Sequence, residues 1–89
     1  MVQYHIRFSD RAQFEDLPKI DVFVREGIAA AIEGKLTTAP DIFGKPLRHT
    51  MHLFKVLRVG DWRVVFIIEK TTVHILTIRH RKKGYDDLA

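Results

Sequence analysis

Arg58 and Arg63 stand two places out on either side of a Gly60-Asp61 pair, in the run RVGDWRVVF. A guanidinium stays charged in any protein environment, because its pKa lies above about 12. Two such groups directly opposite each other on paired strands repel unless an anion or water lies between them. The face that carries them has no carboxylate in these strands, which favours a phosphate as the anion. The alternative is that Arg63 only cross-braces a sheet.

The basic residues are concentrated in the second half of the chain. Residues 1–44 hold five Lys/Arg against seven Asp/Glu, residues 45–85 hold ten against two, and the tail adds two Asp, which gives the net charge of +4. An acidic part followed by a basic part indicates a surface for nucleic acid or phosphate. The alternative is a soluble basic protein with solvated lysines. We favour the binding surface, because several of these charges fall inside apolar strands.

Composition narrows the class of protein. A hydrophobic content of 46% over 89 residues allows one core, so we expect a single domain, 1–89. The absence of cysteine fits a reducing cytosol, so we expect a cytoplasmic location, and no apolar run reaches the roughly 18 residues of a membrane span. The histidines lack ligand spacing, and Asp61 and Glu69 are not clustered. We therefore expect no metal and no cofactor.

Periodicity predicts which elements position these residues. Alternating apolar residues at 2–8 predict a half-buried strand, after which Ser9 can cap a short helix. Strands are predicted at about 51–59, 62–69 and 72–79, where the apolar period falls to two. The first strand should pair at an edge or beside the last strand. Between them, a stripe at spacings of three to four predicts a longer helix carrying Ile20, Val24, Ile28, Ala31, Ile32 and Leu36.

The Gly60-Asp61 pair suits a two-residue hairpin turn, which would place Arg58 directly opposite Arg63 on one face. The bulkier opposite face, which includes Trp62 and Phe66, should take the helices. The predicted fold is α+β, with two N-terminal helices packed on one face of a twisted, mainly antiparallel four-stranded sheet.

Three motifs carry a family resemblance: GKPLR from Gly44, LRVGDWRVVF from Leu57 and ILTIRHRKKGY from Ile75. They closely resemble the RelE/ParE superfamily of toxins, whose typical sequence reads GKPLR…LRVGDYRVVY…V.IL.IGHRKDVY. The resemblance covers nearly the whole chain. It implies a microbial-RNase-like fold and a RelE-like mRNA interferase that cuts translated mRNA in the ribosomal A site without a metal, arresting translation and growth.

The resemblance also implies partners. A cognate antitoxin would wrap and neutralise the toxin, and the ribosome with its mRNA would be the target. Operator DNA would be bound only through the antitoxin complex, and no membrane would be involved.

The same resemblance assigns roles to individual residues. Arg63 would bind and stabilise the scissile phosphate, and Arg81 would act as leaving-group acid or second phosphate clamp. Tyr85 would stack on or orient the nucleotide. Further RNA or phosphate contacts are expected from Arg48, Arg58, Lys45, Lys55, Lys82 and Lys83.

One departure from the RelE pattern leaves the general base open. That pattern has two catalytic lysines on the strand before the hairpin, and here those positions hold Phe54 and Val56. Lys55 lies between them and by alternation points to the other face. His80, next to Arg81, and His52 are the alternative bases, because a histidine pKa near about 6.5 suits proton transfer at neutral pH.

Two other functions compete with mRNA cleavage. One is a ParE-like inhibitor that binds DNA gyrase without catalysis, and the other is a catalytically inactive homologue that acts through antitoxin binding. A tyrosine four residues after Arg81 favours the RelE side, since ParE members generally lack it. Phe54 and Val56 leave the ParE alternative open.

Overall fold

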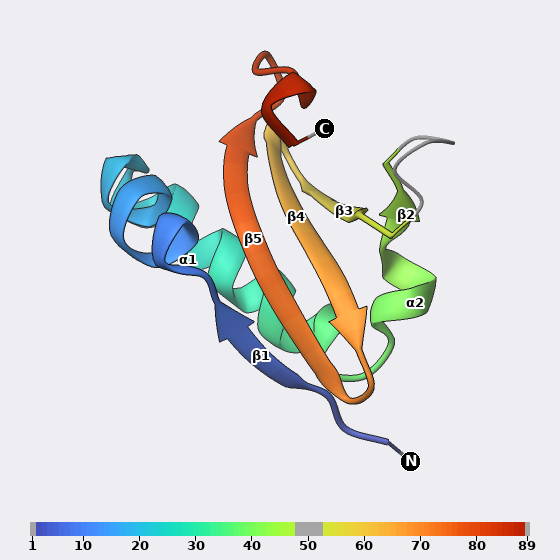
Figure 1. Cartoon of the computed structure of the whole chain (residues 1–89). Helices are drawn as coiled ribbons and strands as arrows, with labels where there is room; N and C mark the ends of the chain where they lie inside the picture. Colours follow the sequence, from blue (N-terminus) through green and yellow to red (C-terminus); the bar gives the residue numbers. More distant parts are fainter. Residues whose placement is uncertain (1, 48–52, 89) are drawn as a thin grey trace.

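A computed structural model describes residues 2–47 and 53–88, and its centre is a twisted five-stranded sheet in the order β1-β5-β4-β3-β2 (Figure 1). Neighbouring strands are antiparallel except for β1, which runs parallel to β5 at one edge. The first strand is therefore both at an edge and beside the last strand, as predicted. The strands are β1 (His5–Phe8), β2 (Lys45–Pro46), β3 (Lys55–Val59), β4 (Trp62–Glu69) and β5 (Thr72–His80).

The α+β class is confirmed, but the predicted number of four strands is wrong. The fifth strand, β2, has only two residues, and its Lys45 and Pro46 pair with Val56 and Lys55 of β3. Two residues that include a proline carry no readable alternation, so the sequence pattern could not indicate this strand.

The helical segments that precede β2 gather on one side of the sheet, and α1 lies behind β5 and β4 in the view of Figure 1, whereas the C-terminal η5 lies near the end of β5. The predicted short helix is η1 followed by η2, and the predicted longer helix is α1 continued directly by η3. A further short helix, α2, precedes β2. Their bounds are η1 (Arg11–Asp16), η2 (Leu17–Lys19), α1 (Val22–Ala31), η3 (Ile32–Leu36), α2 (Pro40–Phe43) and η5 (Asp86–Leu88).

The core lies between this helical layer and one face of the sheet. Ile28, Ile32 and Leu36 of the predicted stripe are buried, whereas Val24 remains 38% exposed. They pack in one cluster with the sheet residues Leu57, Val64, Phe66, Val73, Ile75 and Ile78. The face that carries Trp62 and Phe66 therefore takes the helices, as predicted.

The hairpin between β3 and β4 has the predicted register. Val59 pairs with Trp62 and Arg58 pairs with Arg63, which leaves Gly60 and Asp61 as the turn. Gly60 has φ = +59°, a left-handed conformation in which a side chain would be strained. The two arginines consequently share one face.

A β-bulge changes the register between β4 and β5. From Glu69 to Phe66 each residue pairs regularly with β5, but Phe66 pairs with Ile75 while Val65 pairs with Thr77, so Leu76 is an extra residue. Every later residue of β5 is thereby shifted by one, which moves it to the opposite face of the sheet.

Ser9, two residues before η1, and Asp16, the last residue of η1, form hydrogen bonds with the edge of β5 that lies beyond the end of β1. The Ser9 hydroxyl donates to the Leu76 carbonyl at 2.7 Å and accepts from the Ala12 N–H, so it caps the helical turn that begins at Asp10 and continues into η1, as predicted. Asp16 accepts from the Ile78 N–H at 3.0 Å and from the Thr77 hydroxyl at 2.7 Å. These contacts satisfy polar groups of β5 at the bulge and fix the C-terminal half of the strand.

Candidate functional site

Three arginines lie opposite one another on adjacent strands, on the face turned away from the helices. Arg58 of β3 pairs with Arg63 of β4, and Arg63 pairs with Arg79 of β5. We call Arg58, Arg63 and Arg79 the arginine row. The sequence pattern predicted the first two members but not Arg79, because only the bulge at Leu76 brings that residue onto the same face.

Arg79 is almost completely buried, with 3% of its surface exposed, and its charge is compensated within the chain. It makes a two-pronged contact with Asp87, Nη1 to Oδ1 at 2.7 Å and Nη2 to Oδ2 at 3.2 Å, and Nη1 also donates to the Gly84 carbonyl at 2.6 Å. Arg11 reaches the same carboxylate at 2.9 Å. We call these four residues, Arg11, Arg79, Gly84 and Asp87, the C-terminal latch.

The latch has an electrostatic signature. Hydrogen bonds from Arg79 and then from Arg11 hold the pKa of the Asp87 carboxyl well below its usual range. The guanidinium of Arg79 also lies 5.8 Å from the centre of the Tyr85 ring, a cation–π distance. The latch therefore fixes the segment that carries Tyr85 over the end of the sheet.

Arg63 is partly buried and held by main-chain acceptors of its own hairpin. Its Nη1 donates to the Gly60 carbonyl at 2.8 Å and to the Trp62 carbonyl at 2.9 Å. These contacts orient a guanidinium that has five N–H donors in total. Main-chain carbonyls of its own hairpin therefore hold the Arg63 guanidinium on the face that it shares with Arg58.

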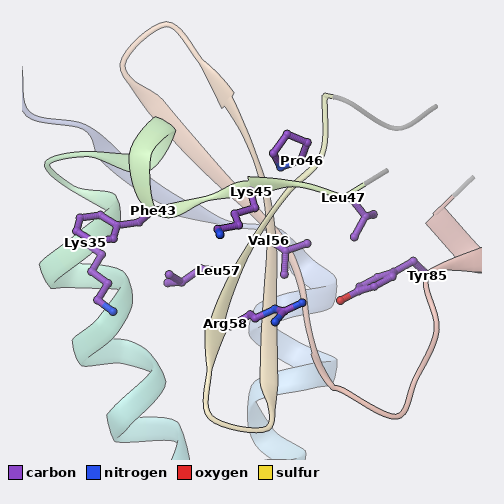
Figure 2. A pocket seen from close by; sticks show the side chains of 9 residues that line it. All are labelled: Lys35, Phe43, Lys45, Pro46, Leu47, Val56, Leu57, Arg58 and Tyr85. Atoms are coloured by element: carbon purple, nitrogen blue, oxygen red, sulfur yellow. The ribbon is translucent and has the colours of Figure 1, made fainter. Parts of the chain in front are cut away.

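Arg58 is exposed and lines a pocket of about 260 Å³, which we call the cationic pocket. Three cationic residues from three segments, Lys35, Lys45 and Arg58, line this pocket. Tyr85 extends toward them from the C-terminal segment, with its hydroxyl end directed at Arg58 (Figure 2). The apolar part of the lining is formed by Phe43, Pro46, Leu47, Val56 and Leu57.

This lining combines the two kinds of group that are required to bind a nucleic acid. The ammonium and guanidinium groups can pair with phosphate oxygens, and the tyrosine ring and apolar surface can contact a base. Lys35 also lies 5.4 Å from the centre of the Phe43 ring, which holds the cation beside the apolar wall. The pocket is therefore suited to a nucleotide of a single strand.

Arg81 lies just beyond β5, at the turn of the β3–β4 hairpin. Its main-chain N–H donates to the Asp61 carbonyl at 2.7 Å, and its Nε is 3.6 Å from the Asp61 carboxylate. Both side chains are more than half exposed, so this ion pair is weak and can exchange for another anion. Lys82 and Lys83 follow in an exposed turn and do not line the cationic pocket.

His80 lies on the face opposite to Arg63, contrary to the grouping expected from the sequence. Its ring packs edge-on against Trp62 at 5.3 Å between ring centres, and its Nδ1 accepts from the Lys82 N–H at 3.2 Å. The bulge is the reason, because it pairs His80 with Trp62 on the helix-bearing face. The structure does not bring His80 together with Arg58 and Arg63.

Lys55 also faces the helical side, as alternation predicted. It pairs with Phe66, whose side chain is buried in the core, and it does not line the pocket. Arg48 and His52, the remaining sequence-derived candidates, lie outside the described residues. Among residues 2–47 and 53–88, no group of three His, Cys, Asp or Glu side chains could hold a metal ion. Within those ranges, no helix has the length and apolarity needed to cross a bilayer.

Comparisons with known proteins identify the class to which this fold and site belong. Residues 6–85 match the family model of the ParE toxin of type II toxin–antitoxin systems, parDE. The chain therefore belongs to this family of type II toxins, within the RelE/ParE superfamily. No curated protein matches the sequence.

Solved structures agree with this assignment. The chain is similar to a chain of the RelBE2 toxin–antitoxin complex from Mycobacterium tuberculosis, with 33% identity and a TM-score of 0.83, covering 93% of this chain and 97% of that one. The RelB-RelE complex from Methanococcus jannaschii shares the fold at 23% identity, with a TM-score of 0.69 and coverage of 92% and 98%. The RelE-RelB complex from Pyrococcus horikoshii shares it at 13% identity, with a TM-score of 0.60 and coverage of 93% and 100%.

Proposed function

We propose that this toxin is a ribosome-dependent endoribonuclease that cuts translated mRNA in the A site, by attack of a ribose 2′-OH on the adjacent phosphorus. The observation that carries the proposal is the meeting of Tyr85 with Arg58 and Lys45 in the cationic pocket. An aromatic ring beside clustered cations suits a nucleotide and its phosphate. The similarity to the RelBE2 complex supports a RelE-type activity.

The reaction needs cations where charge grows on the phosphoryl oxygens, and a proton for the leaving 5′-oxygen. Arg63 binds the scissile phosphate, with its guanidinium held in place by the Gly60 and Trp62 carbonyls. Arg58 shares that phosphate from the neighbouring strand. Arg81 serves as second clamp or acid after leaving Asp61, and Tyr85 stacks on or orients the nucleotide. His80 takes no part as base, because it lies on the other face.

The partners follow from the same proposal. A cognate antitoxin neutralises the toxin, and operator DNA is bound only by the toxin–antitoxin complex. The solved relatives include toxin–antitoxin complexes, which supports a partner of this kind.

The competing function is inhibition of DNA gyrase by binding alone. It is favoured by the matching family model, which describes a ParE toxin, and by Phe54 and Val56 at the positions of the usual lysines. A catalytically inactive homologue that acts only through antitoxin binding is the third possibility.

One experiment separates these functions. The toxin is induced in cells, cut sites are mapped on translated messages, and purified toxin is tested in a gyrase supercoiling assay. We expect codon-phased cuts with normal gyrase, and we expect Arg63→Ala to abolish both the cuts and growth arrest while the fold is retained. Intact messages with inhibited gyrase would replace the proposal by the ParE-like function. Intact messages, normal gyrase and no growth arrest would indicate the inactive homologue.

A further inference from the structure

The β3 strand offers no ammonium to the cationic pocket. At the position where the RelE pattern carries a lysine, this chain has Val56, which is only 8% exposed and forms part of the pocket wall. The neighbouring Lys55 faces the helical side with Phe66. If the proposed reaction takes place here, a positive charge next to Arg58 must come from another element.

Lys45 lies directly across from Val56 on the adjacent strand β2. Opposite residues of an antiparallel pair point to the same face, with Cβ atoms about 4.5–5.5 Å apart. The Lys45 side chain is exposed and lines the cationic pocket together with Arg58 and Tyr85. Figure 2 shows Lys45 beside Val56, with its ammonium end turned to the side of Leu57. Because Lys45 and Val56 share a face and the lysine side chain is flexible, rotation about its bonds can bring this ammonium into the volume that a lysine at position 56 would reach.

The backbone around Lys45 is held closely on both sides. Gly44 permits no side chain, since a Cβ there would overlap the Phe66 ring and lie 2.9 Å from the Pro40 carbonyl oxygen. The Leu47 N–H donates to the Phe54 carbonyl at 2.9 Å, which fastens the chain after β2 to the residue before β3. A lysine on a fixed backbone loses less freedom when its ammonium binds a substrate.

We infer that Lys45 supplies from β2 the ammonium that β3 lacks, and that this ammonium contacts the scissile phosphate beside Arg58. The inference rests on the proposed nuclease function. In the reaction a bond forms between O2′ and phosphorus and the bond from phosphorus to O5′ breaks. The 2′-OH loses its proton, and O5′ gains one. Lys45 stabilises the negative charge that grows on the non-bridging phosphoryl oxygens between these two events.

The test uses the absence of cysteine from the chain. A Lys45→Cys variant has a single thiol, which 2-bromoethylamine converts into a side chain that again ends in an ammonium. We expect Lys45→Cys to cut mRNA on programmed ribosomes about 100-fold more slowly at saturating toxin, since loss of one charge-stabilising group costs about 10²–10³. Aminoethylation should restore at least a tenth of the wild-type rate, whereas alkylation with neutral iodoacetamide should restore nothing.

A relocation variant tests the cross-strand position directly. In Lys45→Val/Val56→Cys the same aminoethylation places the ammonium on β3, and we expect a rate at least tenfold above that of Lys45→Val. The matched control is Lys19→Val, which removes one exposed lysine that does not line the pocket and should change the rate less than about threefold. Melting midpoints of all variants show whether they are folded, and aminoethylation at position 45 gives the answer even if changes at Val56 prevent folding.

The outcomes separate the inference from the function on which it rests. Wild-type cleavage with an equally active Lys45→Cys would overturn the role of Lys45 alone. So would a Lys45→Cys variant that remains folded and slow after aminoethylation. A wild-type toxin that leaves mRNA on ribosomes intact would overturn the nuclease function, and the role of Lys45 with it.

Discussion

The two ends of the arginine row show how the same residue type on the same face takes on different tasks. Arg79 is buried under the C-terminal segment and holds the Asp87 carboxylate, the Gly84 carbonyl and, through Asp87, Arg11. Arg58, two strands away, is exposed in the cationic pocket. A buried arginine whose charge is compensated stabilises the fold, whereas an exposed arginine in a pocket lined by other cations can bind an anion.

The same comparison explains how three arginines can lie side by side on adjacent antiparallel strands. At one end the chain supplies its own carboxylate, in the middle Arg63 binds main-chain carbonyls, and at the open end solvent screens Arg58. The charge of Arg58 is thus left available at the end where Lys35, Lys45 and Tyr85 line the same pocket.

A matched pair of substitutions should reveal the difference between the two ends of the arginine row most clearly. We expect Arg58→Met to lower mRNA cleavage about 100-fold, because it removes a phosphate-binding cation, with almost no change in the melting midpoint. Arg79→Met should lower the melting midpoint by several degrees, because it removes the centre of the C-terminal latch. Both quantities are measured for both variants. A stability loss confined to Arg58→Met would show that the two ends have been assigned the wrong way round.

The latch should also depend on pH, with a direction set by Asp87. Its folded-state pKa is lowered by Arg79 and Arg11, so ionised Asp87 stabilises the fold at every pH above its unfolded pKa of about 3.9. That contribution is lost as the pH falls below this value. We expect the melting midpoint of the wild type to fall more steeply from pH 5 to pH 3 than that of Asp87→Asn, so that the two curves approach each other. Parallel curves over this range would contradict the role of the latch.

The hairpin between β3 and β4 was predictable from the sequence because its signal is local. A two-residue turn with Gly60 at its first position determines that Arg58 faces Arg63, and the register follows by counting. The helix stripe and the Ser9 cap are local in the same sense. The open end of the arginine row was therefore predictable from residues close together in the chain.

The other end was not predictable, because it depends on one extra residue in β5. In a regular hairpin Arg63 would face Ile78, and His80 would lie on the same face as Arg63. The bulge at Leu76 exchanges these faces, bringing in Arg79 and removing His80. Nothing in the local pattern at Leu76 marks a bulge, since it is fixed by the distant Ser9 and Asp16. The contact between Arg79 and Asp87 likewise forms only in the folded chain. Its one signal in the sequence was an arginine at position 79, where the family motif has glycine.

The smallest expected effect is that of a substitution on the exposed surface of α1, away from both ends of the arginine row. Gly27 is in the middle of a helix, and a Cβ built there meets nothing within 4 Å. No neighbouring group among the described residues therefore requires a glycine at this position. Gly27→Ala should raise the free energy of unfolding by about 0.5–1 kcal/mol, because alanine loses less backbone entropy in a helix. Denaturant unfolding measures the gain, which should be the same in the wild type, in Arg58→Met and in Arg79→Met, since neither end of the arginine row touches Gly27. A gain that vanished in Arg79→Met alone would mean that the latch and α1 are coupled, and that the stability of the buried end is not as separate from the helical layer as its contacts indicate.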